Sequence, residues 1–391
     1  MRAPLALALA CALATPAAAQ SLTIPAKHAA LYRALDARLD AFQARLPALG
    51  EREPLLRAAP LSTLRCQQAA DLASDARWQT ALRELDALRR AGAQVIVLEV
   101  CYPLLSPAFH DPRPLLERYA NLANEVRLRE MRLLVRHATL PAQSTMAETG
   151  RYYRSLTRQR LLDERYDEVK SIALALQPEY LTLVSDARTD AAGLVLGARD
   201  WRTYLARAAA DLRRELGDLA PPQGAGLLMW GDTKALESYA AIPGLAYLDL
   251  RFYPAAAGGE DLLERVVTWP QRVRAIDPGK RIVLSEAWLY KGEPASPFAG
   301  ADVDALARES FGFWSPLDVK FLRAVAYGAR VAGIELLGVS RPQYLFAYLD
   351  FFDPATFRAQ ARVLIDLAAQ RAAGAMQRGA LSDTGRAFGA M

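Results

Sequence analysis

The sequence predicts an α/β protein built as a single (β/α)8 barrel, with an extra helix before the first strand. Eight short apolar runs alternate with segments of helical periodicity, and no long β-meander interrupts them. No sequence repeat and no linker divides the chain, so one domain accounts for its length. An open doubly wound sheet is the main rival, but its glycine-rich phosphate loop is missing after the first apolar run.

The first nineteen residues have the pattern of a cleaved secretory signal. Arg2 gives a basic start, residues 5–13 form an Ala/Leu run too short to span a bilayer, and a run of three alanines precedes Gln20. Cys11 lies inside the apolar run and lacks the leucine three residues earlier that lipoprotein signals carry, so lipid anchoring is the weaker interpretation. We expect a periplasmic or secreted protein without a membrane span, whose barrel domain occupies residues 20–391.

Apolar spacing and turn residues place each element. Leucines about four residues apart predict a helix over 21–49, and Pro54 and Pro60 then break the chain before the first strand. Continuous apolar runs such as 94–102 predict buried parallel strands, each followed by an amphipathic helix. The Gly/Ala-rich tail after residue 372 is expected to be loosely ordered.

The remaining elements follow the same two periods in order along the chain. Strands are expected at 61–66, 94–102, 132–138, 180–185, 226–230, 245–253, 280–289 and 332–339. Helices are expected at 21–49, 78–90, 115–129, 148–176, 201–216, 234–241, 261–275, 303–310, 319–330 and 354–372.

Composition argues against several classes of function. The net charge is +5 and the basic side chains are spread along predicted helices, so nucleic acid binding is not expected. Three scattered histidines and few cysteines supply no zinc spacing, so neither a metal nor a cofactor is expected. Cys66 and Cys101 both fall near the ends of consecutive predicted strands. In an oxidising compartment they either form a disulfide or remain two buried thiols, and the oligomeric state is left open.

Two carboxylates stand at the carboxyl ends of predicted strands. In the stretch KRIVLSEAWL, Glu286 appears where the apolar run of residues 282–284 stops. In PEYLTLVSDART, Asp186 has the same place after residues 180–184. The reactive face of a (β/α)8 barrel lies at the carboxyl ends of its strands, and strands four and seven face one another across the mouth. We therefore expect both acids at one open site.

Other polar and aromatic residues stand at strand ends and would complete a ring at the same mouth. Aromatic faces stack on sugar rings, whereas carboxylates and guanidinium groups hydrogen-bond hydroxyls, so the ring suits a neutral polyhydroxylated ligand. The expected ligand contacts are Glu99, Arg136, His137, Trp230, Arg251, Tyr253 and Trp288, with Ser340 and Arg341 at the end of the eighth strand.

The segment around Glu286 resembles the seventh-strand nucleophile motif of clan A glycoside hydrolases, which are retaining (β/α)8 enzymes. The resemblance implies that Glu286 is the nucleophile and that Asp186 takes the place of the fourth-strand acid/base. Tyr253 matches the sixth-strand tyrosine that hydrogen-bonds the nucleophile in that family. Arg136 and His137 correspond to third-strand residues that line the sugar site. A carbohydrate substrate is the partner that the resemblance implies.

The fourth strand departs from the family pattern, which ends in Asn-Glu and is commonly followed by Pro. Ser185 stands for the Asn, Asp186 for the Glu and Ala187 for the Pro. Aspartate is one methylene shorter than glutamate, which withdraws the acid by roughly 1.5 Å. Either the backbone comes closer to the substrate here, or the hydrolytic machinery is weakened or lost. A non-catalytic barrel that binds polysaccharide is therefore the alternative to a retaining glycosidase.

Each candidate residue also has a structural interpretation. Glu286 is also consistent with an ion pair at a strand end, and Asp186 with a loop or helix cap. His137 is equally consistent with a hydrogen-bonded core histidine, and Tyr253 and Trp288 with rim aromatics. Glu99 is an alternative acid to Asp186, although pairing with Arg65 or Arg136 fits its place better. A lyase or deacetylase ranks last because the sequence supplies no metal ligands.

Overall fold

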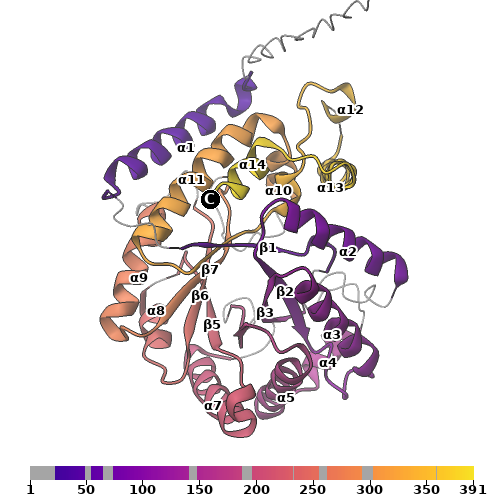
Figure 1. Ribbon diagram of the computed structural model, residues 1–391, viewed down its shortest axis with the longest axis vertical. Helices are drawn as coiled ribbons and strands as arrows, with labels where there is room; N and C mark the ends of the chain where they lie inside the picture. Colours follow the sequence, from indigo (N-terminus) through magenta and orange to yellow (C-terminus); the bar gives the residue numbers. More distant parts are fainter. Residues whose placement is uncertain are drawn as a thin grey trace, which may run out of the picture.

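The computed structural model describes residues 23–48, 54–64, 74–140, 148–186, 196–231, 233–254, 262–292, 303–357 and 359–391. Eight strands form a closed barrel in chain order, and every neighbouring pair is parallel (Figure 1). The strands are β1 (Leu56–Pro60), β2 (Val95–Tyr102), β3 (Arg132–Thr139), β4 (Tyr180–Thr182), β5 (Gln223–Leu228), β6 (Tyr247–Phe252), β7 (Arg281–Ala287) and β8 (Leu336–Val339). The predicted (β/α)8 barrel is confirmed.

Helices surround the barrel, and α1 precedes β1 as expected. Helix α1 packs against α11 through its buried side chains Leu35, Leu39 and Phe42 (Figure 1). The helices are α1 (Ala26–Arg45), α2 (Asp75–Arg90), α3 (Arg113–Leu128), α4 (Thr149–Arg154), α5 (Arg158–Leu176), α7 (Ala198–Leu216), α8 (Thr233–Ala240), α9 (Arg265–Ile276), α10 (Val303–Glu309), α11 (Ser315–Val331), α12 (Pro354–Phe357), α13 (Ala361–Gln377) and α14 (Asp383–Gly389).

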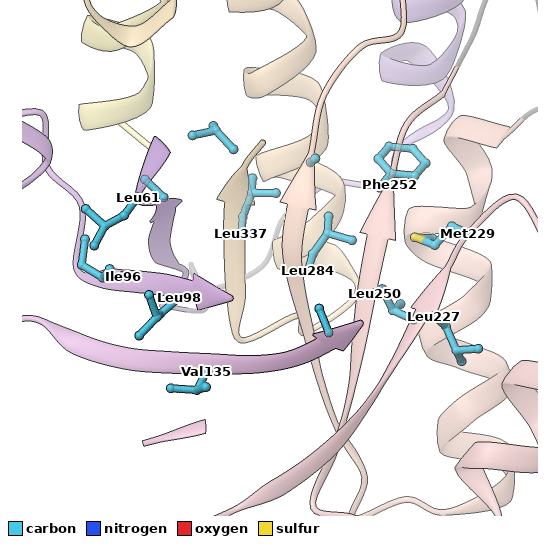
Figure 2. Close-up of a cluster of buried hydrophobic side chains, with 14 of the residues drawn as sticks. Leu61, Ile96, Leu98, Val135, Leu227, Met229, Leu250, Phe252, Leu284 and Leu337 are labelled. Atoms are coloured by element: carbon cyan, nitrogen blue, oxygen red, sulfur yellow. The ribbon is translucent and has the colours of Figure 1, made fainter. Parts of the chain in front are cut away.

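Each strand separates two apolar layers because successive side chains point to opposite faces of the sheet. The inner layer fills the barrel with Ala58, Val95, Val97, Leu134, Tyr180, Tyr247, Val283 and Leu336. The outer layer lies between the strands and the helices, and Figure 2 shows part of it, including Ile96, Leu98, Val135, Leu250 and Leu284. This alternation decides which residues of a strand can reach the mouth of the barrel.

The predicted first strand, 61–66, is wrong. Strand β1 ends at Pro60, and residues Ser62–Leu64 form a short 3-10 helix; residues 65 and 66 lie outside the described part of the chain. The sequence gives little sign of this strand because Arg57 and two alanines have a weak β pattern and because Pro60 resembles a break. A proline is tolerated there because it is the last residue of the strand, where the ladder stops.

Two predicted helices are each divided. The segment 148–176 becomes α4 and α5 because the Thr157 side chain accepts a hydrogen bond from the Arg160 N–H and caps a new helix. The segment 354–372 becomes α12 and α13.

The expectation of a loose tail is also wrong. Helix α13 continues to residue 377, and the Ser382 side chain caps α14, which buries Phe388 and packs against α11. The predicted fifth strand lies three residues too late, since β5 begins at Gln223 directly after Pro222.

Cys101, in β2, is buried and disulfide-bonded. Its partner lies outside the described residues, as do Cys66 and the predicted signal sequence. In the part of the chain that the structure describes, no helix combines the length and apolar content needed to cross a bilayer.

Candidate active site

The inner faces of the strands change from apolar to charged at the carboxyl end of the barrel. On β2 the inward-facing positions are Val95, Val97 and then Glu99. On β3 the inward-facing position after Leu134 is Arg136. The same alternation on β6 places Arg251 on the inner face, with Tyr253 two residues further along. Charged side chains from several strands are thereby brought to one end of the barrel.

A bulge in β7 aims Glu286 into this end. Leu250 pairs with Leu284, yet the next residue of β6, Arg251, pairs with Glu286, so Ser285 is the extra residue. Leu284 belongs to the outer layer, and strict alternation would turn Glu286 to that layer as well. Because the bulge inserts one residue, Glu286 occupies an inward position beside Arg251 instead. Bulges that re-aim a side chain in this way are common next to active sites.

Glu286 is held by two donors, one from β3 and one from the segment after the neighbouring strand β6. Its Oε1 accepts a hydrogen bond from Arg136 Nη2 at 2.6 Å, and its Oε2 accepts one from the Tyr253 hydroxyl. Burial alone would raise the pKa of Glu286, but the charge and hydrogen bond of Arg136, the charge of Arg251 and the Tyr253 hydroxyl together lower it to about 2. Glu286 is therefore an ionised carboxylate at neutral pH, with 13% of its side chain exposed.

Arg136 connects two glutamates. Its Nη2 also donates to Glu99 Oε1 at 2.7 Å, and its Nη1 donates to Ser285 Oγ at 3.3 Å. Its side chain is 1% exposed, and the two carboxylates raise the pKa of Arg136 well above its usual value against the opposing effect of burial. Since Glu99 and Glu286 accept from the same nitrogen, the two carboxylates lie side by side. A buried arginine paired in this way is a fixed cation in the site.

A cavity of about 120 Å³ opens beside this network. Its polar wall consists of Glu99, Arg136, Tyr253, Glu286, Ser340 and Arg341, and residues near the end of β1 supply an apolar wall. The cavity therefore combines a fixed carboxylate with guanidinium and phenol donors. Among the described residues, no group of three or more histidine, cysteine, aspartate or glutamate side chains is arranged to hold a metal ion.

Asp186 lies at the carboxyl end of the barrel but is not part of the described lining of that cavity. Its side chain is 2% exposed, and Arg251 Nη2 pairs with its Oδ2 at 2.5 Å. Arg251 is also the register partner of Glu286, and its charge acts on both carboxylates. Arg251 therefore links the two acids that the sequence analysis singled out.

His137 lies away from the mouth because it follows Arg136 directly and points to the opposite face of β3. It is fully buried, and its Nε2 lies 2.9 Å from Glu168 Oε2 of α5. Burial lowers the pKa of His137 well below its usual value and raises that of Glu168 well above, so burial favours the neutral form of both groups. The pair has the character of a core contact between β3 and α5.

The two predicted tryptophans also differ in position. Trp230 is partly exposed, donates from Nε1 to the Tyr253 carbonyl oxygen at 2.5 Å and meets Tyr290 edge to face. Trp288 is 1% exposed, with its ring stacked on Tyr344 and the Lys291 ammonium 4.7 Å from the ring centroid. Trp230 therefore supports the backbone at Tyr253, whereas Trp288 is buried against Tyr344 and Lys291.

Sequence reasoning missed Ser285, which accepts a hydrogen bond from Arg136, and gave no role to Glu309 of α10, which lies next to Arg341. Arg341 is recognisable as a site candidate from the sequence because it closely follows the eighth predicted strand. No pattern in the sequence indicates Glu309, because it reaches the site from a helix.

Gly338 of β8 leaves the space that the β7 bulge occupies. A Cβ atom at this position would lie 2.0 Å from the Ser285 carbonyl oxygen. We expect Gly338→Ala to lower the free energy of unfolding by about 1–3 kcal/mol, because the added carbon overpacks the barrel. Gly279→Ala is the control, since its Cβ would meet Asp277 Oδ1 at 3.5 Å, an ordinary contact. Equal denaturation midpoints for the two variants would contradict this role of Gly338.

No protein-family model and no curated protein sequence matches the chain. Among solved structures, an exo-β-1,4-mannosidase from Opitutaceae bacterium strain TAV5 is 14% identical with a TM-score of 0.50, over 84% of this chain and 61% of that one. This chain thus spans less than two thirds of that enzyme. A GH5-4 broad-specificity endoglucanase from Clostridium longisporum is 9% identical with a TM-score of 0.50, over 86% and 98% of the two chains.

A family 5 glycoside hydrolase from Prevotella bryantii B14 is 9% identical with a TM-score of 0.47, over 83% of this chain and 100% of that one. At such identities the likeness concerns the fold alone. The chain has the eight-stranded parallel barrel of family 5 glycoside hydrolases.

Proposed function

We propose that this chain is an exported glycoside hydrolase that cleaves a poly- or oligosaccharide by the retaining double-displacement mechanism. The observation that carries the proposal is Glu286, an ionised carboxylate at the end of β7 that faces a cavity and is held by Arg136 and Tyr253. A retaining enzyme needs such a group as its nucleophile. The family 5 barrel fold agrees with this role.

In the first step a Glu286 oxygen attacks the anomeric carbon while an acid protonates the departing glycosidic oxygen. Arg136 and Tyr253 fix the attacking carboxylate, and water then hydrolyses the covalent glycosyl-enzyme with the second carboxyl group acting as base. The lowered pKa of Glu286 favours the ionised form and makes the carboxylate a good leaving group in the second step.

Asp186 is the proposed acid/base, because it stands at the end of the fourth strand and shares Arg251 with Glu286. Glu99 is the alternative: it lines the cavity and accepts from the same Arg136 nitrogen as Glu286. Because both carboxylates accept from one nitrogen, they lie close together. This closeness is compatible with the separation of about 5 to 5.5 Å between the two carboxyl groups of a retaining pair.

A glycan panel followed by two variants tests the proposal. The wild type is expected to release new reducing ends from at least one polysaccharide. Asp186→Asn is then expected to lose about a hundredfold or more in rate on that glycan, yet far less on an aryl glycoside whose acidic phenol leaves without protonation. If Glu99→Gln shows this pattern and Asp186→Asn does not, Glu99 is the acid. If no glycan is cleaved, the hydrolase proposal fails.

One observation favours a second function, that of a non-catalytic barrel that binds polysaccharide. Asp186 is almost fully buried against Arg251, an arrangement that keeps it out of the lining of the cavity beside Glu286. This function predicts glycan binding in titration calorimetry without new reducing ends after prolonged incubation.

Export is part of the proposal. It is supported by the signal-like residues 1–19 and by the disulfide at Cys101, since disulfides persist in oxidising compartments. After cleavage behind Ala19, Cys66 is the one cysteine left to pair with Cys101. Periplasmic fractions should contain a chain that begins at Gln20, and recovery of the uncleaved chain from the cytoplasm alone would contradict export.

The pH profile of activity depends on Tyr253. Because its hydroxyl helps to lower the pKa of Glu286, Tyr253→Phe is expected to raise that pKa and to move the acid limb of kcat/KM upward by about one pH unit. The ionised Glu286 also stabilises the fold, because its pKa is lower in the folded protein than in the unfolded chain. This contribution is complete above about pH 4.5 and is lost as the pH falls through about 2. Tyr327→Phe, on the outer helix α11, is the control. An unmoved acid limb would show that Tyr253 does not tune Glu286.

A further inference from the structure

Arg341 presents its guanidinium group to the cavity from the carboxyl end of β8. It lines the cavity together with Glu286 and Tyr253, and 22% of its side chain is exposed. Burial lowers the pKa of Arg341, but the charge of Glu309 and, more weakly, that of Glu286 raise it above its usual value. The retaining mechanism described above gives Arg341 no task.

Arg341 is only loosely tied to the protein. Its nearest charge is Glu309, whose Oε2 lies 3.6 Å from Arg341 Nε, beyond hydrogen-bond distance, and neither atom has a hydrogen-bond partner. Within the part of the chain that the structure describes, neither Nη1 nor Nη2 of Arg341 makes a hydrogen bond. Glu309 is 2% exposed, so its carboxylate lies on the buried side of the Arg341 guanidinium and orients it. The outer edge of the guanidinium, which carries Nη1 and Nη2, is left unused by Glu309.

Glu286 does not bind Nη1 or Nη2 at the outer edge of Arg341. Both of its oxygens already accept hydrogen bonds, one from Arg136 and the other from Tyr253. The two Nη groups of Arg341 therefore face the cavity as a planar fork of donors. A fork of this kind matches the two oxygens of a carboxylate, with which arginine forms paired, charge-assisted hydrogen bonds.

We propose that Arg341 recognises the carboxylate of a uronic acid unit, so that the substrate is an acidic glycan and not the neutral one that the sequence analysis favours. This inference rests on the proposed function, because it assigns a substrate class to the same cavity. The net charge supports it: it is +5 for the whole chain and +4 once Arg2 is removed with the proposed signal, and a positive protein attracts a polyanionic chain over long distances.

Binding can be measured without cleavage on a Glu286→Gln background. The probes are matched hexasaccharides that differ only at C6: β-1,4-mannuronate against β-1,4-mannose, and β-1,4-glucuronate against β-1,4-glucose. In titration calorimetry at low salt, at least one acidic hexamer is expected to bind roughly tenfold or more tightly than its neutral counterpart. Arg341→Ala should remove that difference, and Arg341→Lys should keep part of it, because lysine retains the charge but not the fork.

Arg362→Ala is the matched control for net charge, since Arg362 is exposed on α13. It should leave the preference for the acidic hexamer unchanged, and melting temperatures identify any variant that has not folded. The inference is overturned if neutral hexamers bind as tightly as acidic ones, if no acidic hexamer binds, or if the alanine and lysine variants weaken both members of a pair equally. A sulfated hexamer that binds in place of the uronates would also overturn it.

The inference and the proposed hydrolase fail in different experiments. If acidic hexamers bind through Arg341 but the wild-type protein releases no reducing ends from them or from any other glycan of the panel, the hydrolase proposal falls and the recognition of uronates stands. If the wild type cleaves neutral glycans alone, hydrolysis stands and the role of Arg341 falls.

Discussion

Replacing Glu286 with glutamine is expected to reduce release of reducing ends by at least about a thousandfold, because the amide cannot attack the anomeric carbon. Glutamine has the same shape and can still accept from Tyr253, so the fold is expected to survive. Arg136 also keeps a carboxylate partner, Glu99. The loss should therefore appear in the rate and not in the melting temperature.

Glu237→Gln is the control for this substitution, since Glu237 lies on α8 with 45% of its side chain exposed. It removes one carboxylate from the protein without touching the cavity and should leave the rate unchanged. Residual activity of the Glu286 variant within tenfold of the wild type would show that Glu286 is not the nucleophile.

Replacing Lys291 with methionine is expected to lower the free energy of unfolding by about 3–5 kcal/mol, because it leaves a buried carboxylate without its cation. The Lys291 ammonium lies 2.6 Å from Asp318 Oδ1, and both side chains are 0% exposed. The Tyr348 hydroxyl donates to the other Asp318 oxygen at 2.9 Å. Removing only the lysine therefore leaves a charge that water cannot reach.

The pH dependence separates this charge effect from lost packing. Burial raises the pKa of Asp318 to about 6, although Lys291 partly opposes the rise. Above pH 6 the Asp318 carboxyl group is ionised in the wild type, and the methionine variant should there lose the most unfolding free energy relative to the wild type. As the pH falls below 6 the carboxyl group takes up a proton, so the difference in unfolding free energy between the two proteins should shrink.

Urea denaturation at pH 5 and at pH 7.5 measures this dependence. Arg89→Ala is the control: Arg89 pairs with Glu130 at 3.0 Å, but the two side chains are 52% and 84% exposed. Such a surface pair is worth less than about 1 kcal/mol. An equal loss for the Lys291 variant at both pH values would mean that packing of the lysine chain, and not its charge, holds this region together.

The barrel was predictable because its signal is repeated eight times. Continuous apolar runs of strand length alternate with amphipathic helices, and an error in one unit leaves the others intact. Strand β1 shows the limit, since alanines and a proline carry little β preference and only pairing with β2 and β8 makes that segment a strand.

The site was predictable in part because polar residues after an apolar strand mark the mouth of a barrel. Arg136 and Tyr253, which follow or end such strands, both donate to Glu286. Adjacent residues of a strand point to opposite faces, so Arg136 and His137 cannot both reach the mouth, and this restriction was available from the sequence. The pairing of Asp186 with Arg251 joins side chains far apart in the chain, and no local pattern encodes it.

The bulge in β7 decides which of two adjacent side chains, Ser285 or Glu286, faces the cavity. If the strand kept Ser285 but ran on without the bulge, strict alternation would turn Glu286 toward the helices, outside the reach of a sugar. The cavity would then lose its acid although no residue of the chain had changed. The backbone conformation of β7 is thus as much a part of this site as the glutamate itself.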